Sequence, residues 1–197
     1  MGYTHYWDRQ KRYNKRVYNH FITDVRKLND WVASNKTANY GGPSFRLRDA
    51  LGGSGTRPHI AKASHTNKNN PGALGFNGDG EEGHESFCFD RVISPGAHAQ
   101  KKPHPTKSTT NLYFDFCKTA QKPYDLMVCA CLILARTHFG EDIQVLSDGE
   151  QQDWDHALDF VNDCCGYNLD IMFSDGIDNN GMVQRVGDLN VFAKKPF

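Results

Sequence analysis

The sequence lacks most of the patterns by which an activity is usually recognised. Its 197 residues contain no C-x-x-C pair, no Walker or dinucleotide-binding motif, no zinc-finger spacing and no H-E-x-x-H motif. The longest apolar run, residues 126–135, is about half of what a bilayer span needs. The first residues contain no apolar segment of the signal-peptide type. These absences predict a soluble, cytoplasmic protein without a membrane partner.

The cysteines lack any spacing that indicates a disulfide framework. Three or four of the six fall within apolar helical patterns, where thiols usually pack as small apolar groups. We therefore expect reduced, packed thiols, as is usual inside cells. The six are Cys88, Cys117, Cys129, Cys131, Cys164 and Cys165.

The chain also lacks a net charge, because 23 basic residues balance 23 acidic ones. The charges are distributed unevenly: residues 1–62 carry twelve basic and four acidic residues, and residues 141–197 carry three and twelve. Residues 6–18 mix basic and aromatic side chains, as single-strand binders do, but a solvated first helix explains them better. The neutral total and the acidic last third make nucleic acid an unlikely partner. If the charged ends stay apart, the gradient favours contacts with a protein partner or self-assembly.

The apolar pattern predicts one α+β domain over residues 1–197, with a small mixed sheet packed against about three helices. Residues 3–7 alternate as a strand, and residues 14–33 carry apolar side chains at spacings of three and four, which is typical of a core-facing helix. Between residues 114 and 165 we expect strand, buried helix, short strand and amphipathic helix in turn. Gly and Asn favour a long loop at 64–84, and Pro, Lys and His favour another at 94–110. Residues 168–197 read as an irregular C-terminal extension, with possible short strands at 183–186 and 189–192.

Neither of two candidate metal sites has the pattern that a metal requires. Glu81, Glu82, His84 and Glu85 offer ligands, but a solvated acidic loop explains them better. In residues 175–181 an EF-hand alignment places glycine where the first and twelfth ligands should be carboxylates. The sequence therefore predicts no metal site and identifies no cofactor.

The stretch from Cys117 to Asp125 is the best candidate for an anion site. Lys118 and Thr119 precede a predicted helix start, where a cation, a hydroxyl and free amides can bind a phosphate or a carboxylate. The same helix start would lower the pKa of the Cys117 thiol, but no Gly-rich nucleophile turn or fixed Cys-His spacing supports a nucleophile there. No glycine occurs in this stretch for close backbone approach to a phosphate.

Several motifs together resemble a group of short proteins encoded by phages, prophages and some bacterial genomes. The likeness covers about half of the chain and comprises MGYTHYW at the start, GFNG at 75–78, His84-Glu85, FCKTA and KPYD at 116–125, and Ser147-Asp148-Gly149. The 94–110 loop and the tail after Tyr167 depart from it. If the chain is viral, the resemblance implies a place in the host cytoplasm or the virion.

The polar residues of these motifs lie at predicted strand ends and helix starts, so one cleft could hold them. We expect proton transfer by His5, Glu85 or Asp148, and binding of a small anion such as a nucleotide by Asn77, Lys118, Thr119, Tyr124 and Asp125. The alternative is a structural or interaction component of a larger, viral assembly. The sequence alone does not establish whether the protein is an enzyme.

Overall fold

A computed structural model describes residues 3–41, 43–50, 57–64, 66–67, 70–93, 101–103, 111–177 and 183–194. Its α-helices are α1 (Lys15–Ala33), α2 (Asp125–Phe139) and α3 (Asp155–Cys165). The strands are β1 (Thr4–Gln10), β2 (Leu47–Arg48), β3 (His59–Ala61), β4 (Ala73–Gly78), β5 (Phe87–Cys88), β6 (Lys101–Pro103), β7 (Asn111–Lys118), β8 (Ile143–Ser147), β9 (Leu169–Ile177) and β10 (Val183–Ala193). Short 3-10 helices are η1 (Lys36–Asn39), η2 (Gly80–Glu82), η3 (Gly140–Asp142) and η4 (Gln151–Trp154).

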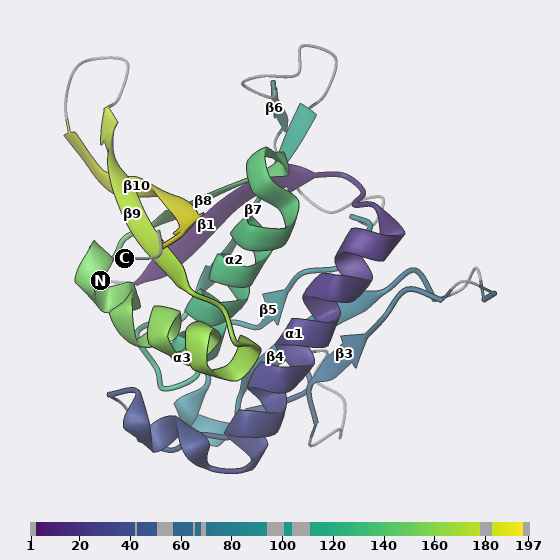
Figure 1. Cartoon of the computed structure of the whole chain (residues 1–197), viewed down its shortest axis with the longest axis vertical. Helices are drawn as coiled ribbons and strands as arrows, with labels where there is room; N and C mark the ends of the chain where they lie inside the picture. The colour runs from purple at the N-terminus through teal and green to yellow at the C-terminus, as the bar shows by residue number, and fades with distance from the viewer. Residues whose placement is uncertain are drawn as a thin grey trace.

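The larger sheet is built around the first strand of the chain (Figure 1). Its strand order is β6-β7-β1-β8-β10-β9, and every described pairing is antiparallel. His5 is opposite Cys117 on one side and Ser147 on the other. The N-terminal strand therefore brings the ends of β7 and β8 to its own start.

A smaller antiparallel sheet forms inside the segment that we expected to be a loop. Strand β4 pairs with β2, β3 and β5, and five of its six residues are buried. The expectation of a loop throughout 64–84 is therefore wrong for residues 73–78. The glycines there permit close packing: a Cβ on Gly78 would lie 2.3 Å from Glu82 O, and one on Gly83 would lie 2.4 Å from Gly78 O.

The C-terminal extension is also more regular than its composition predicts. Strands β9 and β10 form a long antiparallel pair, and β10 joins the larger sheet through β8. The expectation of an irregular extension over 168–197 is wrong for 169–177, and the two short strands expected at 183–186 and 189–192 are parts of one strand, 183–193. Of the predicted 94–110 loop only residues 101–103 are described, and they form β6; the rest lies outside the described residues.

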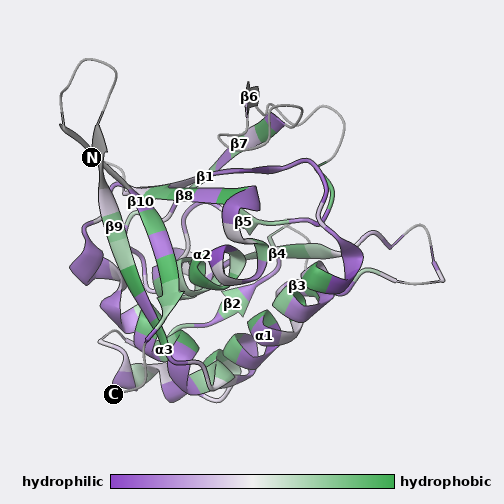
Figure 2. Cartoon of the chain, turned by 45° about the horizontal axis from the view of Figure 1, so that its top comes forward, coloured by the Kyte–Doolittle hydropathy of each residue, from purple (hydrophilic) through white to green (hydrophobic). Residues whose placement is uncertain are grey.

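Three helices pack against the sheets. Helix α2 contacts α1, α3, β8 and β10, and ten of its fifteen residues are buried, so it is enclosed on several sides. Asn14 caps α1 by accepting hydrogen bonds from the amides of Arg16 and Val17. In Figure 2 hydrophobic and hydrophilic residues alternate along α1, as the spacing predicts.

Aromatic side chains join the two sheets and the helices in one core. Trp7 packs 5.3 Å from Phe87, and Phe89 lies 5.4 Å from Phe21 and 5.9 Å from Phe139 between ring centroids. This continuity agrees with a single folding unit. The predicted α+β class with three helices is confirmed, and the strands form two antiparallel sheets.

Two further findings concern the residues that the structure describes. No described helix has the length and hydropathy needed to cross a membrane. All six cysteines are free.

Candidate functional site

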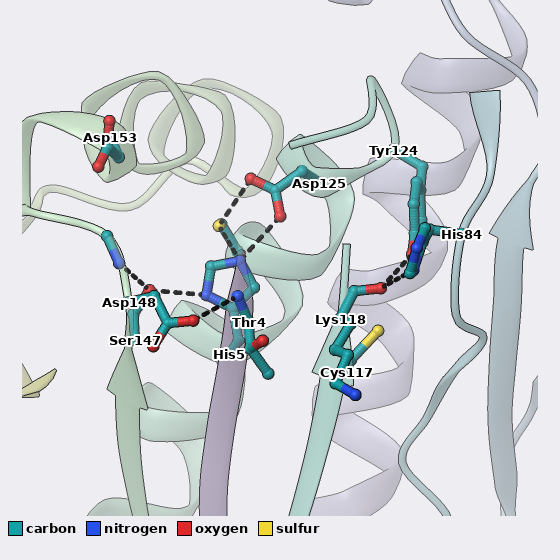
Figure 3. Close-up of polar contacts among 12 residues, drawn as sticks. Thr4, His5, His84, Cys117, Lys118, Tyr124, Asp125, Ser147, Asp148 and Asp153 are labelled. Atoms are coloured by element: carbon teal, nitrogen blue, oxygen red, sulfur yellow. Dashed lines mark hydrogen bonds and ion pairs between the residues drawn. The ribbon is translucent and has the colours of Figure 1, made fainter. Parts of the chain in front are cut away.

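His5 lies at the centre of a buried polar cluster on the helix-facing side of β1 (Figure 3). Its Nδ1 is 2.9 Å from Ser147 Oγ, and its Nε2 is 2.8 Å from Asp125 Oδ1. Ser147 Oγ also accepts a hydrogen bond from the Gly149 amide. Because these partners come from β8 and α2, the ring is held from two sides and has one fixed orientation.

Cys129 and Tyr3 complete this cluster. Cys129 lies one helical turn after Asp125, with Sγ 3.5 Å from His5 Nε2 and 3.8 Å from Asp125 Oδ2. Burial first, and then the neighbouring carboxylates of Asp125 and Asp153, raise the pKa of the Cys129 thiol well above its ordinary value. Burial first, and then the charges of Cys129 and Asp125, raise the pKa of the Tyr3 hydroxyl, whereas its hydrogen bond with Ser147 acts in the opposite direction.

Asp148 faces away from His5, although it directly follows β8, the strand that pairs with β1 at His5. Its carboxylate accepts hydrogen bonds from the Thr4 amide at 3.0 Å and from the Tyr6 hydroxyl at 3.2 Å. Since side chains alternate along β1, Tyr6 lies on the sheet face opposite to that of His5. Asp148 therefore has a different set of partners from the His5 cluster.

Glu85, Lys118 and Tyr124 form a third group at the end of β7. Glu85 accepts a hydrogen bond from the Lys118 amide at 2.9 Å, and its carboxylate lies 3.8 Å from Lys118 Nζ. The Tyr124 hydroxyl donates to Glu85 O at 2.6 Å. In the described part of the chain no hydrogen bond or ion pair joins His5, Glu85 and Asp148 to one another. Their shared part in proton transfer stays a prediction.

Two other predicted ligand-binding residues have contacts that support the backbone. Asn77 accepts from the amides of Gly78 and His84 and donates to His84 O and Ser86 Oγ, so it closes the turn after β4. Thr119 is fully buried; its amide donates to Tyr3 O, and its hydroxyl has no partner in the described residues.

The thiol of Cys117 is not activated by its position before α2. Burial first, then the nearby carboxylates of Glu85 and Asp125, outweigh the Tyr124 hydrogen bond and raise its pKa to about 12. The thiolate that a nucleophile requires is therefore disfavoured near neutral pH. The expected lowering of this pKa is wrong, because the residue is enclosed.

A separate arginine-lined groove lies between the C-terminal half of α1 and the segments of β2 and β3. Its volume is about 940 Å³, within the range of small-molecule sites. Four arginines and two aspartates line it, namely Arg26, Arg46, Arg48, Arg57, Asp30 and Asp79. The charge of the lining is therefore positive.

Three of these arginines are available for a ligand. Arg26 donates from Nε and Nη2 to Ile60 O, which ties β3 to α1. Arg46, Arg48 and Arg57 are exposed, and within the described residues none has a side-chain hydrogen bond or ion pair. Sequence analysis missed this groove, although the alternation of buried Phe45 and Leu47 with Arg46 and Arg48 places both arginines on one side.

Comparison of the chain with protein-family models, curated proteins and solved structures gave no match.

Proposed function

We propose that the protein binds a phosphate-bearing small molecule, of the nucleotide class, in the arginine-lined groove. The supporting observation is the convergence of Arg46, Arg48 and Arg57 on one hollow without partners in the described structure. Guanidinium groups present forked donors that match phosphate oxygens. The ligand is the small anion expected from the sequence, but its proposed site is the arginine-lined groove and not the stretch from Lys118 to Asp125.

The contacts around Lys118 favour this different location. Its ammonium faces the Glu85 carboxylate, and Asp125 already supplies a negative charge at the positive end of α2. The amides of Asp125 and Met127 donate to Lys122 O and Tyr124 O, so they are occupied. An anion would have to displace these contacts, whereas the groove requires no such exchange.

Binding is tested with inorganic pyrophosphate, AMP and ATP by isothermal titration calorimetry. Arg46→Gln and Arg48→Gln are each expected to weaken the affinity for the best of these ligands about tenfold, because each removes one charge-assisted contact worth roughly 1.5 kcal/mol. Arg16→Gln removes the same charge from the exposed first turn of α1 and should leave the affinity unchanged. No binding by the unmodified protein, or equal loss in all three variants, would contradict the proposal.

A second candidate function is self-assembly, as expected of an assembly component. Met172 and Phe192 are 52% and 45% exposed. Their pairing partners are Asn190 and Asp170, so both apolar side chains lie on the same outer face of β9 and β10. Adjacent exposed apolar groups of this kind favour contact with a second copy of the chain.

Self-assembly is tested by sedimentation velocity over a range of protein concentrations. The unmodified protein should form a dimer or larger species, and the Met172→Ser/Phe192→Ser double variant should sediment as a monomer, because the apolar contact area is lost. The control is Gln152→Ser, which changes an exposed polar side chain elsewhere on the surface. Lys27→Ser is unsuitable as a control because it removes an ion pair. Monomeric behaviour of the unmodified protein would remove this candidate.

A further inference from the structure

The His5 cluster contains three different metal-binding groups whose ligand atoms converge. His5 Nε2, an Asp125 carboxylate oxygen and Cys129 Sγ all lie within 4.8 Å of one another. In a tetrahedral zinc site with bonds of about 2.0–2.3 Å, the ligand atoms are roughly 3.5 Å apart. The distances of 3.5 Å and 3.8 Å from Cys129 Sγ to His5 and Asp125 are close to this value. The 2.8 Å distance from His5 to Asp125 is that of a hydrogen bond, which a metal would replace.

The surroundings hold the imidazole as metal sites require. Ser147 Oγ lies 2.9 Å from Nδ1 and directs Nε2 toward Asp125 and Cys129. Tyr3 and Trp154 pack edge-on against the ring, with centroid distances of 5.1 Å and 5.0 Å. The ring therefore cannot turn its Nε2 away from the cluster without losing all of these contacts.

A thiol and a hydroxyl lie beside the imidazole ring. The Cys129 thiol contacts His5 Nε2 at 3.5 Å and Asp125 Oδ2 at 3.8 Å, and the buried Tyr3 hydroxyl lies against Ser147. A cation bound between Cys129 and His5 would take the deprotonated Cys129 sulfur as a ligand.

We propose that His5, Asp125 and Cys129 bind one zinc ion. The set of one imidazole, one carboxylate and one sulfur matches the preferences of this borderline-soft cation. On binding, the Cys129 sulfur loses its proton to solvent and the histidine–aspartate hydrogen bond opens. Asp125 is 17% exposed at its side chain and provides the route of entry, whereas His5 is fully enclosed. The ion would join β1 to α2 and stabilise that junction.

The test uses the purified full-length protein, stripped with a chelator and titrated with Co²⁺ and then Zn²⁺. One Co²⁺ per chain should bind with visible bands of tetrahedral geometry and a thiolate-to-cobalt charge-transfer band, and one equivalent of Zn²⁺ should remove both. Cys129→Ser should lose the charge-transfer band. Cys131→Ser should keep it, because this equally buried cysteine on the same helix lies outside the cluster.

A third variant removes the contact between Ser147 and His5 Nδ1 and leaves the three proposed zinc ligands unchanged. Ser147→Ala should retain the charge-transfer band but weaken Co²⁺ affinity about 10- to 100-fold, since the histidine loses its orienting partner. The proposal is overturned if the unmodified protein takes up no stoichiometric Co²⁺ or Zn²⁺, or if Cys129→Ser keeps the band. These outcomes are independent of phosphate binding in the groove.

Discussion

Replacement of Asp24 by alanine should destabilise the protein by about 3 kcal/mol, because it removes the common partner of three side chains. Asp24 has 8% side-chain exposure and accepts from Lys27 at 2.7 Å and from Tyr167 at 2.6 Å, and it lies 2.9 Å from His138 Nε2. These partners come from α1, α2 and the segment before β9. Denaturant unfolding measures the loss, and Asp159→Ala, an exposed carboxylate on α3, should change stability by less than about 0.5 kcal/mol.

The same network predicts a pH dependence. Burial alone would raise the pKa of Asp24, but the hydrogen bonds from His138, Lys27 and Tyr167 outweigh it and lower the pKa far below 3.8. A carboxyl group whose pKa is lowered by folding stabilises the protein at pH values above its pKa in the unfolded chain. This stabilisation is lost as the pH falls toward the pKa in the folded protein. The stability difference between the unmodified protein and Asp24→Asn should therefore be full at pH 6 and shrink below about pH 4. A constant difference down to pH 2.5 would show that the carboxylate contributes little.

Replacement of Asn77 by alanine should cost about 2–4 kcal/mol, since the amides of Gly78 and His84 lose their acceptor in a buried turn. Asn77→Asp keeps that acceptor but places a buried carboxylate oxygen against His84 O, where a donor stood, so its cost should be at least as large. Both are measured by thermal unfolding, with exposed Asn111→Ala as the control. If Asn77 acts mainly as a ligand contact, these variants will unfold like the unmodified protein and differ only in ligand binding.

The fold was predictable where one periodic pattern decided the structure. Strand β1 and helix α1 follow the alternation and the helical spacing of their apolar residues. Strand β4 was not predictable because its glycines indicate turns, whereas in the structure they permit close packing against neighbouring strands. The β9–β10 pair was predicted only in part. The apolar runs at 183–186 and 189–192 indicated two short strands, but the turn-forming residues beside them gave no indication of one long strand or of its partner β9.

The sequence indicated where some polar residues lie, but it gave no sign of the arginine-lined groove. The pattern placed His5, Lys118, Asp125 and Asp148 at element ends, and their part in a binding or catalytic site stays a prediction. The contacts among these residues depend on the face of the sheet to which each side chain points. His5 and Asp148 point to opposite faces and therefore have different partners. Cys129 was overlooked because an apolar helix offers a sufficient reason for a buried thiol.

The central position of β1 sets an order for the folding of a newly made chain. His5 is synthesised before its partner Ser147, which follows 142 residues later. At typical rates of synthesis this interval is roughly ten seconds or more. During it, the aromatic strand β1 has no neighbouring β8 to pair with, and contacts between such distant segments form slowly. The nascent chain should therefore engage a chaperone at β1, and the His5 cluster can assemble only after β8 has been made.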